Sequence, residues 1–175
     1  MRTIGQIFSL LFSFIAFVVL AVCMTGCEEK KMAKVEENKA IVKSFVEQVQ
    51  NRHDIGALDE LFSPDFVDHS GISTPPTLEG TKQFFTMFFA AFPDMHVTIH
   101  DQVAEGDNVV TRKTLQGTHQ GEFLGIPPAG KPVKFDVIDI FRIADGKITD
   151  HWAVADMLGL MQQIGAIPSP GQAGE

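Results

Sequence analysis

The sequence predicts an α+β fold, with helices in the amino-terminal half and an antiparallel sheet after them. Apolar residues recur at helical spacing over residues 35–50 and 78–92. Four later segments are rich in Val, Ile, Phe and Thr, and turn residues separate them, as in strands linked by hairpins. This segregation of helices from strands favours α+β over a parallel α/β sheet.

Composition and charge narrow the class of protein. The chain has 175 residues, of which 45% are hydrophobic and 21% are charged, as expected for one globular domain. The net charge is −8, and no basic cluster exceeds Lys30-Lys31. Because nucleic-acid binding requires a positive surface, we do not expect a nucleic-acid partner.

The amino terminus has the features of an export signal. Arg2 precedes an uncharged apolar run over residues 7–24, which is short for a membrane span and typical of a signal peptide. The following Met24-Thr25-Gly26-Cys27 resembles the lipobox of bacterial lipoproteins, so we expect Cys27 to become the lipidated first residue. An uncleaved anchor helix is the alternative. Both interpretations attach an exported domain to a membrane of the cell envelope.

These signals divide the chain into four segments: a signal peptide over 1–26, a charged tether over 27–34, a folded domain over 35–168 and a flexible tail over 169–175. With Cys23 removed and Cys27 acylated, the folded domain has no thiol. Neither a disulfide nor a cysteine nucleophile is then available. The stability of the domain must come from its core.

The predicted helices of the first half cover residues 35–50, 55–62 and 78–92. Asp54 is a suitable N-cap for the second helix. The chain is extended over residues 65–69 and forms a polar loop over 71–77. The third helix has a stripe of Phe84, Phe85, Phe88, Phe89 and Phe92. We expect this stripe to pack in the core and Phe88 to line a pocket for a flat apolar ligand.

The predicted strands cover residues 96–104, 109–118, 135–143 and 148–155, and a last helix covers 157–164. Asp145-Gly146 matches a hairpin turn that requires positive φ. His96 and His100 alternate with apolar residues, so we expect them to face water and not to bind a metal. For the strand over 109–118, alternation leaves open which face is inward.

The chain lacks the motifs of cofactor and metal chemistry. It has no nucleotide-binding glycine pattern, no Gly-x-Ser-x-Gly, no His-Glu-x-x-His and no cysteine cluster. Acid/base chemistry without a cofactor or metal is what remains. The candidate side chains are His69, Arg112, His119, Asp139, His151 and Asp156.

Asp156 is the predicted acid/base. It ends the last strand four residues after Trp152, so in a regular strand the two side chains share a face. An indole that shields a carboxylate from water raises the pKa of the carboxyl group. His69 and Arg112 are predicted to orient a carbonyl group of the substrate. The alternative for Asp156 is the N-cap of the last helix.

Four further residues are predicted to contact the substrate: Trp152, His119, Asp139 and Phe88. Phe88, His119 and Asp139 each have a structural alternative. Arg112 inside the fold would pair with a carboxylate such as Asp139 or with an anionic ligand, and His119 could support the loop that follows it. His151 alternates with Trp152, so only one of the two can face a pocket.

Several ordered motifs resemble the SnoaL-like polyketide cyclase family, often labelled ester cyclase. They are Gly-Thr-His-Gln-Gly-Glu-Phe-Leu-Gly-Ile-Pro-Pro from Gly117, Phe-Arg-Ile-Ala-Asp-Gly-Lys-Ile from Phe141, His-Trp-x-x-x-Asp-x-Leu-Gly-Leu from His151, Ala-Phe-Pro-Asp at 91–94 and Glu-Gly-Asp at 105–107. The resemblance implies the ketosteroid-isomerase-like cone, a curved antiparallel sheet around a pocket that helices close. It also implies an intramolecular aldol reaction without metal, with Asp156 in the acid/base role, and a homodimer formed through the exposed face of the sheet.

Two functions stay open at this point. The first is an exported cyclase, lyase or isomerase that acts on a small hydrophobic carbonyl compound. The second is a catalytically silent lipoprotein that binds an apolar ligand. The chain contains no Tyr, which argues against an oxyanion site built on a phenol.

Overall fold

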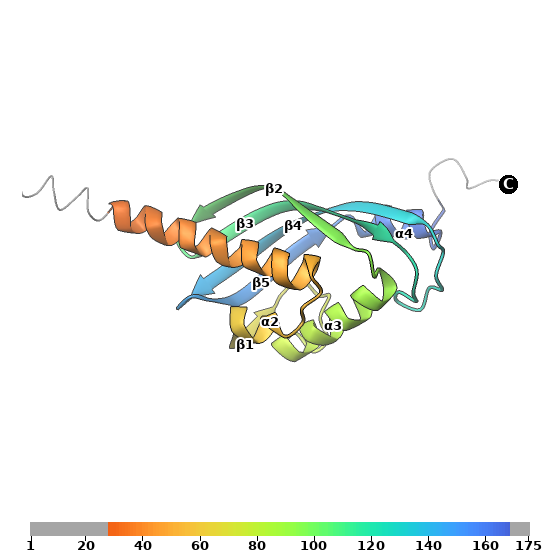
Figure 1. Ribbon diagram of the computed structural model, residues 1–175, viewed down its shortest axis with the longest axis horizontal. Helices are drawn as coiled ribbons and strands as arrows, with labels where there is room; N and C mark the ends of the chain where they lie inside the picture. Colours follow the sequence, from red (N-terminus) through yellow and green to blue (C-terminus); the bar gives the residue numbers. More distant parts are fainter. Residues whose placement is uncertain (1–27, 169–175) are drawn as a thin grey trace, which may run out of the picture.

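The computed structural model describes residues 28–168. The predicted signal peptide, Cys27 and the tail over 169–175 lie outside the described residues. A long helix covers residues 28–45 and continues as the π-helical segment η1, Val46–Asn51. The segment 28–34, predicted as a tether, is thus the exposed first part of this helix (Figure 1). Within residues 28–168, no helix is long and apolar enough to cross a membrane.

A curved five-stranded sheet forms the body of the molecule (Figure 1), which confirms the α+β prediction. Its strands are β1 Phe62–Asp68, β2 His96–Glu105, β3 Asn108–Thr118, β4 Pro132–Ala144 and β5 Lys147–Ala155, in the order β1-β5-β4-β3-β2. The last four strands pair antiparallel, as predicted. The first strand pairs parallel with β5, so the sheet is mixed and not wholly antiparallel.

Three shorter helices complete the fold: α2 Ala57–Leu61, α3 Leu78–Ala91 and α4 Met157–Ile164. The N-cap of α2 is Gly56, not the predicted Asp54, and no side chain caps this helix. The Thr77 hydroxyl caps α3 by accepting a hydrogen bond from the amide of Gly80. In Figure 1 the long amino-terminal helix, α2 and α3 lie on one side of the curved sheet.

Strand β4 shows how the sheet divides the molecule. Its side chains alternate between buried and exposed along its whole length. The buried row consists of Val133, Phe135, Val137, Asp139, Phe141 and Ile143. We call the face that carries this row the inner face and the opposite one the outer face. A carboxylate within an otherwise apolar inner row marks the place where chemistry is possible.

The helices pack onto the inner face through aromatic side chains. Phe88 contacts Phe92 and Phe123, and Phe45 of the long helix contacts Phe62 and Phe141. The Asn51 side chain at the end of η1 exchanges two hydrogen bonds with the backbone of Val97 in β2, at 2.8 and 3.2 Å. This pair of hydrogen bonds fixes η1 against the edge of the sheet.

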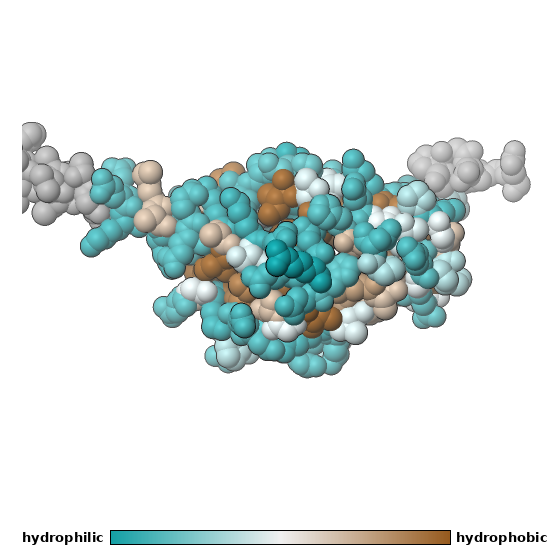
Figure 2. Space-filling view, viewed as in Figure 1, coloured by the Kyte–Doolittle hydropathy of each residue, from teal (hydrophilic) through white to brown (hydrophobic). Residues whose placement is uncertain are grey.

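The face shown in Figure 2 is mainly hydrophilic with separate apolar patches.

Candidate active site

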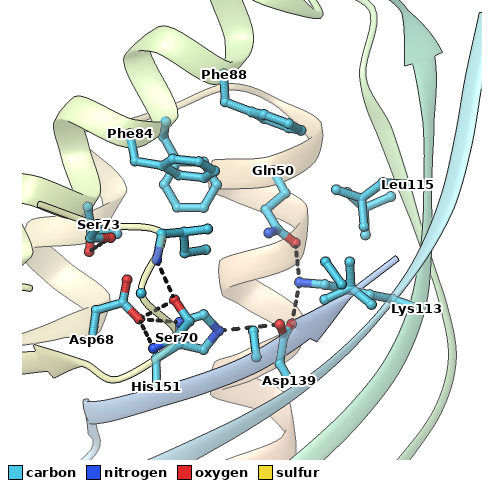
Figure 3. Close-up of a pocket in the computed structure, with 18 of the residues that line it drawn as sticks. Gln50, Asp68, Ser70, Ser73, Phe84, Phe88, Lys113, Leu115, Asp139 and His151 are labelled. Carbon is cyan, nitrogen blue, oxygen red and sulfur yellow. Dashed lines mark hydrogen bonds and ion pairs between the residues drawn. The ribbon is translucent and has the colours of Figure 1, made fainter. Parts of the chain in front are cut away.

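A cavity of about 460 Å³ lies between the inner face of the sheet and the helices. Most of its wall is apolar and aromatic, with Phe84, Phe85, Phe88 and Phe89 of α3 among the lining residues. Figure 3 shows Phe84 and Phe88 on α3 across the cavity from a set of polar side chains. An apolar cavity with a few grouped polar side chains is the usual form of a small-molecule site.

The polar wall is a continuous chain of side chains, one from each of four neighbouring strands and one from η1. These are Asp68 of β1, His151 of β5, Asp139 of β4, Lys113 of β3 and Gln50 (Figure 3). The His151 ring lies between the two carboxylates, with Nδ1 3.2 Å from Asp68 and Nε2 3.3 Å from Asp139. The Lys113 ammonium forms an ion pair with Asp139 and donates to the Gln50 amide oxygen at 3.0 Å.

The two carboxylates control the charge of His151. Burial alone would lower the pKa of His151, but hydrogen bonds and charge attraction from Asp139 and Asp68 outweigh burial and raise it. The imidazole is therefore held as an imidazolium at higher pH than usual, able to give a proton. The ring also stacks on Phe141, at 4.6 Å between centroids, which fixes its plane.

Both carboxylates are held in the charged form. Burial alone would raise the pKa of Asp139, but the Lys113 ammonium and His151 outweigh burial and lower it. Burial opposes ionisation of Asp68 as well, yet hydrogen bonds from His151 and Ser70 hold its pKa well below the usual range. The Ser70 hydroxyl and amide donate to the same Asp68 oxygen at 2.6 and 2.9 Å.

The network is balanced in charge, with the cations of Lys113 and His151 against the anions of Asp68 and Asp139. The side chains of Asp68, Asp139 and Lys113 are each at most 3% exposed, whereas that of His151 is 13% exposed. His151 is thus the most accessible of the four groups. A proton that enters the network from a ligand can pass between His151 and Asp139, which share a hydrogen bond.

The structure places two predicted residues at the cavity and five elsewhere. Asp139 and Phe88 line the cavity. Asp156 does not line it, because this exposed carboxylate accepts a hydrogen bond from the Gly159 amide at 2.8 Å and caps α4. The capping alternative describes Asp156, and we no longer assign it the acid/base role.

His69, Trp152 and Arg112 lie outside the cavity. The His69 ring stacks on Trp152 at 4.6 Å and contacts Asp150 at 2.9 Å through Nε2. Arg112 is exposed and forms an ion pair with Asp101 of β2 at 2.6 Å. Arg112 is next to Lys113 and Trp152 is next to His151, and both of these neighbours line the cavity. Successive residues of a strand point to opposite faces, so Arg112 and Trp152 point to the outer face, where His69 stacks on Trp152.

His119 is fully buried but does not line the cavity. Its Nδ1 accepts a hydrogen bond from the Ala129 amide at 3.2 Å, and its ring stacks on Phe92. His119 therefore supports the loop between β3 and β4, which was the structural alternative for this residue.

The sequence reasoning missed Asp68, Lys113 and Gln50, and it left His151 without a role. Each of the first two is one residue from a predicted one: Asp68 precedes His69, and Lys113 follows Arg112. Apolar neighbours two positions away were the available signal, since Phe66 shares a face with Asp68 and Leu115 shares one with Lys113. Gln50 reaches the cavity from a π-helical turn, which helical periodicity does not reveal.

The comparisons with known proteins agree on a family. The model of the SnoaL-like polyketide cyclase family matches residues 40–164. Aklanonic acid methyl ester cyclase DnrD of Streptomyces peucetius is 29% identical over 61% of this chain and 72% of its own length. Nogalonic acid methyl ester cyclase of Streptomyces nogalater is 30% identical over 62% of this chain and 83% of its own.

A solved structure has the same fold as this chain. TsrD from Streptomyces laurentii superposes with a TM-score of 0.69 at 31% identity, over 75% of this chain and 97% of that one. The aligned part contains most of the described residues. The cone-like fold expected from the sequence is thus confirmed.

Proposed function

Because the chain belongs to the SnoaL-like polyketide cyclase family, we propose that it closes a ring in a small, mostly apolar carbonyl compound by a cofactor-independent acid/base reaction of the aldol type. The single observation that carries this proposal is the chain of Asp68, His151, Asp139 and Lys113 along one wall of an otherwise apolar cavity. It supplies proton donors, proton acceptors and cations side by side.

The proposed reaction begins with loss of a proton from a carbon next to a carbonyl group, and Asp139 accepts this proton. The resulting enolate attacks a second carbonyl carbon of the same molecule, and the oxygen of that carbonyl takes a proton from the His151 imidazolium. The proton on Asp139 then returns to His151 across their 3.3 Å contact, so that no net proton is consumed.

The other polar residues support this transfer. The Lys113 ammonium and the imidazolium stabilise the negative charge that develops on oxygen during the reaction. Asp68 holds His151 through Nδ1 and so directs Nε2 toward Asp139. Gln50 accepts a hydrogen bond from Lys113, which positions the ammonium.

The balance of charge favours an uncharged substrate. A ligand carboxylate at this wall would be an anion without a free cation, because Lys113 and His151 already pair with carboxylates. An ester has no such charge. The relatives described above are named for methyl esters, which supports the proposal that the substrate is esterified.

Turnover of aklanonic acid methyl ester and nogalonic acid methyl ester, compared with the two free acids, tests this function. Ring closure leaves the mass unchanged, so the product is detected by its retention in chromatography and by NMR. We expect product from at least one ester and much slower reaction of its acid. Absence of product from both esters, or equal rates for ester and acid, would contradict the proposed substrate class.

We propose in addition that the protein is an exported lipoprotein anchored through Cys27. Support comes from the apolar run over residues 7–24 and from the Met-Thr-Gly-Cys sequence that follows it. Mass spectrometry of the protein purified from membranes should find an acylated Cys27 as the first residue, and Cys27→Ala should leave the precursor unprocessed. An intact Met1 on the wild-type protein would exclude processing.

We also propose a homodimer that buries the outer face of the sheet. This face has exposed apolar side chains on β2, β4 and β5, with exposed fractions between 38% and 77%: Val103, Ile138, Ile140 and Val154. A patch of this kind is typical of an interaction surface. Light scattering on residues 36–168 should give twice the mass of one chain, and a monomer at tens of micromolar would contradict the dimer.

A further inference from the structure

Leu124 is an exposed leucine in a backbone conformation that leucine disfavours, at the opening of the cavity. It lines the cavity and yet is 57% exposed, so it lies where the cavity meets solvent. We propose that Leu124 is a specificity-determining residue, an apolar lip that contacts the part of a long ligand that extends out of the cavity. This inference rests on the proposed function, because it assumes an apolar ligand inside.

The local geometry of Leu124 is that of a tight hairpin turn. Phe123 and Ile126 exchange two backbone hydrogen bonds, at 3.0 and 2.9 Å, around Leu124-Gly125. The φ angles of the two central residues are 51° and 80°, as in a type I′ turn. Asn-Gly is the preferred pair in this turn, whereas the left-handed conformation costs an ordinary L-residue about 1–2 kcal/mol.

The segment that leads into the turn is fixed to the fold, so that Leu124 has a defined place. Phe123 is buried and packs against Phe88 and Phe92. The amide of Gly121 donates to the Ala91 carbonyl at the end of α3, and a Cβ at Gly121 would lie 2.3 Å from the carbonyl oxygen of Ala90. Leu124 is therefore presented by a rigid support.

A second apolar residue of the cavity opening is tied to the polar network. Ile72 lines the cavity and is 42% exposed. Its amide donates to the Ser70 hydroxyl oxygen at 3.3 Å, and that hydroxyl donates to Asp68 (Figure 3). Ile72 and Leu124 thus give the opening two apolar contacts, from the β1–α3 loop and from the β3–β4 loop.

Stability alone does not account for a leucine at this position. An exposed apolar side chain gains little from folding, and the turn would be more stable with Asn. Residues that hold backbone strain without a packing gain are found where function requires them. Contact with a ligand would bury the Leu124 side chain and provide the favourable free energy that offsets the backbone strain.

Two fluorescent ketones test this lip. Prodan and Laurdan have the same neutral dimethylaminonaphthalene ketone and differ only in the acyl chain, which is short in Prodan and long in Laurdan. With the full chain, Leu124→Asn should weaken Laurdan binding ~5- to 10-fold, as expected for the loss of most of one leucine contact. Prodan binding should change by less than about twofold, because its shorter chain stays inside the cavity. The same substitution should raise Tm by about 2–4 °C.

Asp145→Leu is the matched control. Asp145-Gly146 forms the β4–β5 turn with φ angles of 50° and 76°. This turn lies at the opposite end of β4 from the β3–β4 loop, to which Leu124 belongs (Figure 1). A leucine there has the same backbone strain without the ligand contact. Asp145→Leu should lower Tm and leave the Kd of both ketones unchanged.

The outcomes separate the lip from the proposed reaction. The proposal that Leu124 contacts the ligand is wrong if Leu124→Asn weakens the binding of both ketones equally or of neither. It is also wrong if the wild-type protein binds neither ketone. Turnover of the methyl esters by Asp139→Asn, measured in parallel, reports on the reaction alone. If Asp139→Asn abolishes turnover while Leu124→Asn shows no dependence on chain length, the reaction stands and the lip does not.

Discussion

In the proposed reaction His151 gives a proton to the substrate, and its charge depends on the two neighbouring carboxylates. Its pKa is raised by Asp139 and Asp68 against the effect of burial. A group with a raised folded-state pKa stabilises the fold below its ordinary pKa, and this stabilisation is lost as pH rises through the raised value. The two carboxylates, whose pKa values are lowered, give the opposite dependence, with stability lost as pH falls through the lowered values. We therefore expect the greatest stability between these limits.

Asp68→Asn should shift the alkaline limb of the pH–rate profile to lower pH. The substitution removes one of the two anions that favour the imidazolium, so His151 loses its proton at lower pH than in the wild-type protein. The rate of ester turnover measured over pH 5–10 checks this. Arg142→Gln, which changes a charge on the outer face, is a suitable control. An unchanged alkaline limb in Asp68→Asn would mean that Asp68 does not act through His151.

The Lys113–Asp139 pair should show the asymmetry of a buried ion pair. Lys113→Met leaves the Asp139 anion in an apolar surrounding and should cost about 3–5 kcal/mol of unfolding free energy. The double substitution Lys113→Met with Asp139→Leu removes both charges and should recover most of that loss. Urea unfolding of the two single variants and the double variant measures the coupling. Additive losses in the double variant would show that the two charges are not coupled.

Helix α4 depends on its N-cap, the side chain of Asp156. The Asp156 carboxylate satisfies the Gly159 amide at the start of the helix. Asp156→Ala should lower the free energy of unfolding by about 0.5–2 kcal/mol, the usual cost of losing an N-cap. The turnover per folded molecule should be unchanged. A large loss of turnover at unchanged stability would return Asp156 to the active site.

The elements themselves could be predicted from the sequence, because their periodicity is strong. The last helix has the predicted bounds, and each of the four long strands agrees with its prediction to within a few residues. The parallel pairing of β1 with β5 could not be predicted, since the partner lies far away in the chain and no hairpin connects them.

The strand faces explain why the site was only partly predicted. Asp139, one of the predicted residues, lies on β4, where the alternation of faces is uninterrupted. Strand β5 is irregular, with a register shift opposite Arg142 and Ile143, and Ile148 and His151 are both on the inner side despite their odd spacing. A shift of this kind moves all later side chains to the other face. It therefore placed His151, and not Trp152, in the cavity.

The fold brings distant parts of the chain to one wall of the cavity. Asp68 and His151 are 83 positions apart in sequence, and Gln50 and Lys113 are 63 apart. Four neighbouring strands align Asp68, His151, Asp139 and Lys113 in a row, with opposite charges next to each other. The same curvature of the sheet encloses the apolar volume in front of them. An acid/base site and an apolar binding volume thus follow from one architecture.

We propose that the cavity network, and not Asp156 at the end of the last strand, performs the proton transfer. The most direct measurement compares kcat of Asp139→Asn and Asp156→Asn on the methyl ester that the wild-type protein converts, with folding of each variant checked by circular dichroism. We predict a loss of about 10²–10⁴-fold for Asp139→Asn, the usual contribution of general acid/base catalysis, and wild-type kcat for Asp156→Asn. Wild-type kcat in Asp139→Asn together with a large loss in Asp156→Asn would contradict this assignment.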